Sequence, residues 1–199
     1  MLVLVRHAES SGNAQARLVG RADVPLTPRG RQQIEDLSRV LGPAVRVISS
    51  PLRRAVETGE GLGLGPTVET DDRWIEIDYG ELDHRPLAEV PGDLWRHWRA
   101  DPSYEPPGGE SLVEVGRRVR DACEELFARE GEGARRTDGD VVVVSHVSPI
   151  KAAVAWALGQ PEDLVWRLQL STGSITRIGW TGRHPILHTY NASPDPGAP

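Results

Sequence analysis

The sequence predicts an α/β fold in which helices pack around a largely parallel β-sheet. Short apolar runs alternate with segments of helical periodicity, a pattern typical of βαβ units. Three of these runs are expected to form buried strands: Leu2–Val5, Ala44–Ile48 and Val141–Val144. The 199 residues suit one well-buried domain, because domains usually contain roughly 100–200 residues.

The first predicted long helix lies between the first two strands. It should begin at Pro28, since Thr27 is a good N-cap and proline suits the first helical position. Apolar residues then recur on one face, at Ile34, Leu37 and Leu41. The Gly42-Pro43 pair ends this helix, and the strand Ala44–Ile48 follows it, interrupted by Arg46.

A second long helix is expected to begin at Ser111, where Ser-Leu-Val-Glu matches a capping box. Apolar residues follow at spacings of three and four, at Leu112, Val115, Val119, Ala122 and Leu126. The glycine-rich segment 131–140 is interpreted as a flexible loop before the strand Val141–Val144. Two more strands, Ser174–Thr181 and Ile186–Tyr190, should flank a turn.

Residues 1–191 are expected to form a single domain. Within it, the segment 83–109 is rich in proline, glycine, tryptophan and arginine and has little regular periodicity, so we expect an insertion that overhangs a site. Residues 192–199 are predicted to form a disordered tail.

Composition and charge exclude several classes of protein. The formal net charge of −6 argues against a protein that binds nucleic acid or a membrane surface. Cys123 is the sole cysteine, so no intramolecular disulfide can form and a secreted, disulfide-rich fold is disfavoured. The first apolar run ends at Arg6, which is too short for a signal peptide or a membrane span. A cytoplasmic protein is therefore expected.

Basic and imidazole side chains follow the ends of the three predicted strands. Arg6 and His7 follow the first strand, Arg53 and Arg54 the second, and His146 the third. A Ser-Pro pair also follows the second and third strands. Because serine favours N-caps and proline the first helical turn, each of these strands should lead almost directly into a helix.

Such side chains should meet at one edge of the sheet, because ligands of α/β folds bind at the carboxyl ends of the strands. Arginine forks and helix N-termini there suit a phosphate dianion, and an imidazole can act on it covalently or transfer a proton. Taken singly, each residue would more often be structural; together they predict a phosphate site. No cysteine or histidine spacing predicts zinc, and neither a Walker lysine loop nor GxGxxG is present, so no metal or cofactor is expected.

The motifs resemble those of the histidine phosphatase superfamily, also called the phosphoglycerate mutase-like family. The signature around the first histidine is Arg6-His7-Ala8-Glu9-Ser10, with Asn13 three residues beyond it. The other matching stretches, in order, are GRADVPLTPRGRQQ (20–33), SSPLRRAVET (49–58), IEIDYGEL (75–82), PPGGES (106–111), VVVVSHVSPIK (141–151) and TYN (189–191). The resemblance implies a three-layer α/β/α sandwich around a mostly parallel mixed sheet.

The resemblance also implies a role for each matched residue. His7 would attack phosphorus and become phosphohistidine, and Glu76 would be the general acid and base. The groups that would hold the phosphoryl oxygens are Arg6, Asn13, Arg54, His146 and the backbone N–H of Val147. The acids near Glu76, namely Asp78, Glu81 and Asp83, are interpreted as solvated loop residues.

The expected activity is hydrolysis of small phosphorylated metabolites without a metal. Departures from the family pattern are Ala8 in place of glycine, Val147-Ser148-Pro149 in place of a glycine-containing turn, and Lys151 in place of arginine. A mutase-type phosphoryl transferase is the first alternative; it is disfavoured because the basic residues between Glu76 and Gly109 are scattered, at Arg85, Arg96, His97 and Arg99. A non-catalytic phosphate-binding pseudo-phosphatase is the second alternative. The physiological substrate and the oligomeric state stay open.

Overall fold

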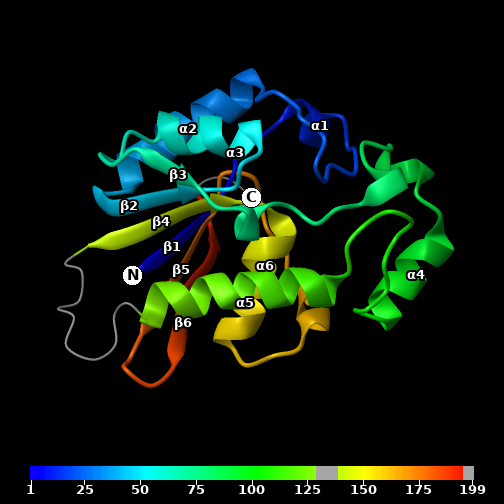
Figure 1. Cartoon of the computed structure of the whole chain (residues 1–199). Coiled ribbons are helices and arrows are strands. Elements are labelled where there is room, and N and C mark those ends of the chain that lie inside the picture. The colour runs from blue at the N-terminus through cyan, green and yellow to red at the C-terminus, as the bar shows by residue number, and fades with distance from the viewer. Residues whose placement is uncertain (129–138, 195–199) are drawn as a thin grey trace.

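The computed structural model describes residues 1–128 and 139–194 and shows a mixed β-sheet between two layers of helices (Figure 1). Within these residues the sheet has six strands in the order β3-β2-β4-β1-β5-β6. The strands are β1 Leu2–Arg6, β2 Ala44–Ser49, β3 Val68–Thr70, β4 Asp140–Ser145, β5 Ile175–Trp180 and β6 Pro185–Ala192. Neighbours from β3 to β1 are parallel, and β5 is antiparallel to both β1 and β6. The predicted α/β sandwich with a mostly parallel mixed sheet is confirmed.

Helices cover both faces of this sheet. The helices in the described ranges are α1 Ser11–Ala14, α2 Pro28–Val40, α3 Arg53–Gly61, α4 Gly92–Ala100, α5 Leu112–Ala128 and α6 Val147–Ala157. In Figure 1, α2 and α3 lie on one face of the sheet, and α5 and α6 on the other. Four 3₁₀ segments are described as well: η1 Asp72–Trp74, η2 Gly80–Leu82, η3 Leu87–Glu89 and η4 Glu162–Arg167. No helix in the described ranges has both the length and the apolar character needed to cross a bilayer.

The strand β1 is buried on both faces from Leu2 to Val5, which explains why these four residues are all apolar. Leu2 and Leu4 pack into the core cluster that contains the apolar residues of α5 and α6. Val3 and Val5 point the other way, into the cluster that contains Ile34 of α2. The two clusters therefore follow the two-residue period of a strand.

Both long helices predicted from their caps are present. Thr27 Oγ1 accepts a hydrogen bond from the Gly30 N–H at 3.0 Å, which caps α2. At the start of α5 the Ser111 N–H donates to Glu114 Oε2 at 3.0 Å, and the Glu114 N–H donates to Ser111 Oγ at 3.3 Å. The capping box of Ser111 is therefore confirmed.

The Ser-Pro pairs lie close to helix starts as predicted, but their serines are not the N-caps. The N-cap of α3 is Leu52 and that of α6 is His146. Ser50 instead hydrogen-bonds His146 across the sheet edge, at 2.7 Å between Ser50 Oγ and His146 Nε2. Ser50 Oγ also accepts from the Leu52 N–H at 3.3 Å, so this hydroxyl links the start of α3 to the second strand end without being the N-cap.

The segment 83–109 contains more regular structure than its composition predicts, because α4 lies within it. The side chain of Trp98 on this helix is only 1% exposed and belongs to the main core cluster. Packing of that indole stabilises a nine-residue helix that would be marginal in isolation.

Two predicted flexible segments fall mostly outside the described residues. In the predicted loop 131–140, residues 131–138 lie outside the described range, and Asp140 already belongs to β4. In the predicted tail 192–199, Ala192 is the last residue of β6 and residues 195–199 lie outside the described range.

Candidate active site

The carboxyl ends of β1, β2 and β4 finish at one edge of the sheet. The register pairs Arg6 of β1 with Ser145 of β4, and Ser49 of β2 with Val144 of β4. The residues that follow these strand ends are therefore brought together. Arg54 Nε lies 3.3 Å from His7 Nε2, and the ring centroids of His7 and His146 are 4.9 Å apart.

The His7 ring has a defined tautomer. Its Nδ1 lies 2.7 Å from the carbonyl oxygen of Ala8, which can only accept, so Nδ1 carries the proton. Its Nε2 then carries the lone pair and accepts from the Arg54 Nε–H. Burial, followed by the charges of Arg54 and Arg6, lowers the pKa of His7 well below its usual value. His7 is thus neutral at pH 7, as a nucleophile must be.

His146 is also neutral, because burial and then the charge of Arg54 lower its pKa well below the usual value. Its Nε2 is paired with Ser50 Oγ. Its Nδ1 is buried and has no hydrogen-bond partner among the residues that the structure describes.

A cavity of about 110 Å³ opens beside His7. Five of the predicted site residues line it: Arg6, His7, Asn13, Glu76 and Val147. Arg54 and His146 are not part of the lining that the described residues form; they contact His7 instead. The cavity therefore joins an imidazole, a carboxyl group and a guanidinium group.

Arg6 and Asn13 present hydrogen-bond donors to this cavity. One terminal nitrogen of Arg6, Nη1, donates to the Leu170 carbonyl at 2.6 Å, while its Nε is buried without a partner among the described residues. Burial lowers the pKa of Arg6 to about 10, so it remains charged at neutral pH. Asn13 Oδ1 accepts from the Ser10 N–H at 3.0 Å, which leaves its amide NH₂ as a donor.

Glu76 lies at the N-terminus of α6. Its Oε2 accepts from the Val147 N–H and its Oε1 from the Ser148 N–H, both at 3.1 Å, and Oε1 also accepts from its neighbour Ile77 at 2.9 Å. The partial positive charge of a helix N-terminus suits a carboxylate. The Val147 N–H, predicted as a phosphate donor, is therefore occupied by Glu76 in this structure.

Sequence reasoning missed two polar residues of the cavity, Arg17 and Tyr79. Arg17 lies beyond the end of α1, after Ala16 has turned the chain with a φ of +51°, so no helical spacing could have placed it. Arg17 Nη1 donates to the His84 carbonyl at 2.8 Å, which ties it to the segment 83–109. Tyr79 lies within the quoted IEIDYGEL motif, whose aromatic residue could have been considered.

The interpretation of Asp83 as a solvated acid is wrong. Its carboxylate accepts from three consecutive backbone N–H groups, those of Gly20 at 2.7 Å, Arg21 at 2.9 Å and Ala22 at 2.8 Å. The carbonyls of Gly20 and Ala22 in turn accept from Arg54, at 2.7 and 2.9 Å. Asp83 thus fixes the loop that orients the Arg54 guanidinium against His7.

Asp83→Asn is therefore expected to lower kcat for a phosphomonoester about tenfold, because one acceptor oxygen is lost and Arg54 is less well held. The affinity for inorganic phosphate should fall as well, measured by competitive inhibition. Asp101→Asn is the matched control, since Asp101 is exposed and its carboxylate accepts only from Ser103 among the hydrogen bonds that the structure shows. A lower melting temperature with unchanged kcat would show that Asp83 is only structural.

No three side chains of histidine, cysteine, aspartate or glutamate in the described ranges come together as a metal site would require. The polar groups of the cavity are instead donors, one carboxylate and the His7 imidazole, a set that suits a bound oxyanion.

Comparison with known proteins agrees with this geometry. The model of the histidine phosphatase superfamily (branch 1) matches residues 2–193. A glucosyl-3-phosphoglycerate phosphatase of Mycolicibacterium vanbaalenii is 34% identical over 206 residues, covering 99% of this chain and 88% of that protein. Phosphoserine phosphatase 1 of Hydrogenobacter thermophilus is 33% identical over 199 residues, covering 96% of this chain and 91% of that protein.

The fold is also similar to solved structures. A mycobacterial glucosyl-3-phosphoglycerate phosphatase in complex with VO3 superposes with a TM-score of 0.85 and 33% identity, covering 96% of this chain and 98% of that one. Some curated relatives are longer. Proteins of Mycobacterium tuberculosis and Mycobacterium bovis are 36% identical over 183 residues, yet the chain spans only 49% of their length.

Proposed function

The chain belongs to the histidine phosphatase superfamily (branch 1), and from this membership we propose that it hydrolyses small phosphomonoesters through a phosphohistidine on His7, without a metal ion. The observation that carries the proposal is the state of His7. His7 is buried and neutral, and its Nδ1–H is bound to the Ala8 carbonyl. The free lone pair is therefore on Nε2, the ring nitrogen that lies beside Arg54.

In the first step His7 Nε2 attacks phosphorus, and the bond between phosphorus and the ester oxygen breaks. The leaving oxygen takes a proton from Glu76, which lines the same cavity and enters this step as the carboxylic acid, so the products are an alcohol, phosphohistidine and the Glu76 carboxylate. In the second step water attacks phosphorus and gives a proton to the Glu76 carboxylate. The bond between phosphorus and Nε2 breaks, which releases phosphate and restores neutral His7.

The remaining residues supply charge and donors for the phosphoryl oxygens. Arg6 lines the cavity with a buried Nε that has no partner among the described residues, and the NH₂ of Asn13 faces no internal acceptor that the structure shows. Arg54 and the unpaired Nδ1 of His146 lie next to His7. The Val147 N–H would join them once a phosphoryl oxygen replaces Glu76 at the start of α6. Fixed donors of this kind stabilise the charge of the transition state.

The basic residues of the segment 83–109 favour a phosphatase over a mutase. A mutase must hold a second anionic group of its substrate, and the candidates were Arg85, Arg96, His97 and Arg99. All four side chains are exposed, and none lines the cavity beside His7. These four residues therefore offer no second anion site beside His7.

The decisive experiment measures hydrolysis of p-nitrophenyl phosphate by the protein in excess EDTA, together with rapid quenching for a phosphoenzyme. We expect turnover to survive EDTA and the phosphoenzyme to be labile in acid and stable in base, as phosphohistidine is. Loss of turnover in EDTA that is restored by a divalent cation would contradict the metal-free mechanism. A base-labile, acid-stable phosphoenzyme would point to a carboxyl or hydroxyl nucleophile instead.

A further inference from the structure

A second cavity, of about 140 Å³, adjoins the cavity beside His7. Tyr79 and Val147 line both cavities, so the two meet at these residues. Ile77, the residue after Glu76, also lines the second cavity. The two cavities thus share Val147, whose N–H is bound to Glu76, the proposed proton donor.

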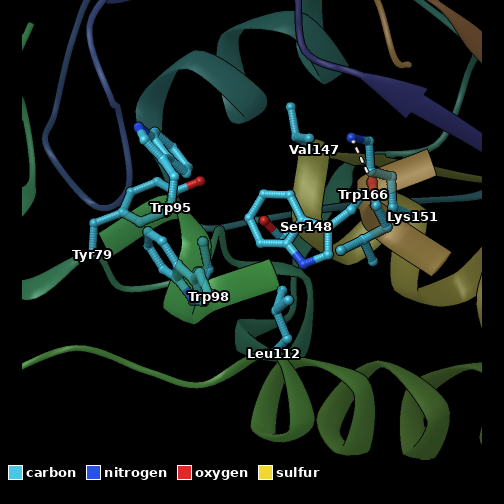
Figure 2. A pocket seen from close by; sticks show the side chains of 10 residues that line it. Tyr79, Trp95, Trp98, Leu112, Val147, Ser148, Lys151 and Trp166 are labelled. Atoms are coloured by element: carbon cyan, nitrogen blue, oxygen red, sulfur yellow. Dashed lines mark hydrogen bonds between the residues drawn. The ribbon is translucent and has the colours of Figure 1, made fainter. Parts of the chain in front are cut away.

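Four aromatic rings contribute to the walls of the second cavity. Tyr79, Trp95 and Trp98 gather on one side, and Trp166 extends toward them from the other side, where Lys151 also lies (Figure 2). Trp95 and Trp98 are stacked with ring centroids 5.7 Å apart, and both rings lie 6.2 Å from that of Trp166. The segment 83–109 and η4 therefore build one aromatic cage from distant parts of the chain.

The cavity has the size of a small ring. An engineered apolar cavity of about 150 Å³ is known to bind benzene, so about 140 Å³ accommodates one six-membered ring. Flat aromatic walls favour such a ring further, because aromatic pairs stabilise each other beyond the apolar area that they bury.

The polar groups of this cavity do not suit a leaving group with many hydroxyls. Lys151 Nζ is engaged with the Val165 carbonyl at 3.1 Å, and Tyr79 and Ser148 contribute two hydroxyl groups to the described lining. The indole N–H groups of Trp98 and Trp166 are buried without an acceptor among the described residues, but they only donate. A sugar would give up hydrogen bonds from its several hydroxyls to water, and the two hydroxyls of this wall could replace only a few of them.

We propose that this cavity binds the alcohol part of the substrate, and that it selects phosphomonoesters whose alcohol carries an apolar or aromatic ring. The proposal rests on the phosphatase function above, because it places the ring where an alcohol released beside Glu76 would lie. It deepens that function by naming a substrate class that differs from phosphorylated amino acids and sugar derivatives.

Binding is tested first, because it does not depend on turnover. The probes are 3-phenylpropylphosphonate and propylphosphonate, in which a CH₂ group replaces the ester oxygen, so neither can be hydrolysed. Calorimetric titration should show that the phenyl group tightens binding about 10- to 100-fold, the gain expected from burial of one ring. Turnover of 2-phenylethyl phosphate and ethyl phosphate, both esters of primary alcohols, should show a similar ratio of kcat/KM.

Removal of a wall identifies the cavity as the cause. Trp166→Ala, and independently Trp95→Ala, should reduce the advantage of the phenyl group to less than about threefold and leave the affinity for propylphosphonate unchanged. Trp180→Ala is the matched control, since its indole is 38% exposed and stacks on Phe127, away from the cavity. It should keep the full advantage.

Equal affinity of the two phosphonates for the unaltered protein would overturn the inference. A sugar phosphate that competes for the site more strongly than 2-phenylethyl phosphate does would overturn it too. An advantage that persists in both tryptophan variants would place the ring elsewhere and would overturn it as well. Selective phosphonate binding without hydrolysis of any ester would support the ring site and contradict the proposed phosphatase function, so the two failures are distinguishable.

Discussion

His7→Ala is expected to reduce kcat for p-nitrophenyl phosphate by at least about a thousandfold and to abolish the phosphoenzyme. No neighbouring group offers the same chemistry, because His146 Nε2 is engaged with Ser50 and its Nδ1 is buried. A thousandfold loss corresponds to about 4 kcal/mol of transition-state stabilisation, a moderate figure for removal of a nucleophile. Steady-state assays and acid- and base-quenched samples measure the two effects separately.

The fold should tolerate this change. The imidazole of His7 is neutral, so its removal leaves no buried charge unpaired, and only the Arg54 Nε–H and the Ala8 carbonyl lose a partner. His184→Ala is the control, because His184 is an exposed histidine on the turn between β5 and β6. A His7→Ala protein that folds and still turns over at an ordinary rate would show that another residue is the nucleophile.

Glu76→Gln is expected to separate substrates by their leaving groups. An alkyl alcohol needs a proton as it leaves, whereas p-nitrophenolate is stable without one. We therefore expect kcat/KM for 2-phenylethyl phosphate to fall about 10²- to 10⁴-fold and that for p-nitrophenyl phosphate to fall less than tenfold. Glutamine keeps the size of the side chain and can still accept from one backbone N–H at the start of α6.

Two further measurements make the Glu76 result specific. Glu81→Gln changes an exposed acid of the same motif and should leave both substrates unaffected. Thermal unfolding of Glu76→Gln reports any loss at the α6 N-terminus, where two N–H groups of the helix now share the Glu76 carboxylate. Equal losses of kcat/KM on both substrates in a folded protein would assign the proton transfer to another group.

Local patterns predicted the regular elements well where capping and periodicity agreed. Thr27 with Pro28, and Ser111 with Glu114, identified the starts of two helices because capping depends on neighbouring residues alone. The cap prediction failed for the serine of Ser50-Pro51, whose hydroxyl bonds to a residue 96 positions away. The helix α4 was missed because the packing of Trp98, not its local sequence, stabilises it.

The sequence by itself determined which chemical groups stand at the sheet edge. The three buried strands run parallel, so their carboxyl ends share one edge of the sheet. The residues at these ends must therefore lie at that edge: Arg6-His7, Ser50 and Ser145-His146. The order of motifs also identified Glu76 among several acids, although no local physical signal did so.

Only the tertiary structure decided how these groups are held and what surrounds them. Glu76 binds the N-terminus of α6, which is 71 residues away in the sequence. Asp83 binds the loop that orients Arg54, from which it is separated by 61 to 63 residues. The aromatic cage joins Trp95 and Trp98 to Trp166 from a separate element. Such contacts depend on the relative placement of whole elements, and so does the burial that keeps His7 neutral. No local pattern of residues encodes that placement.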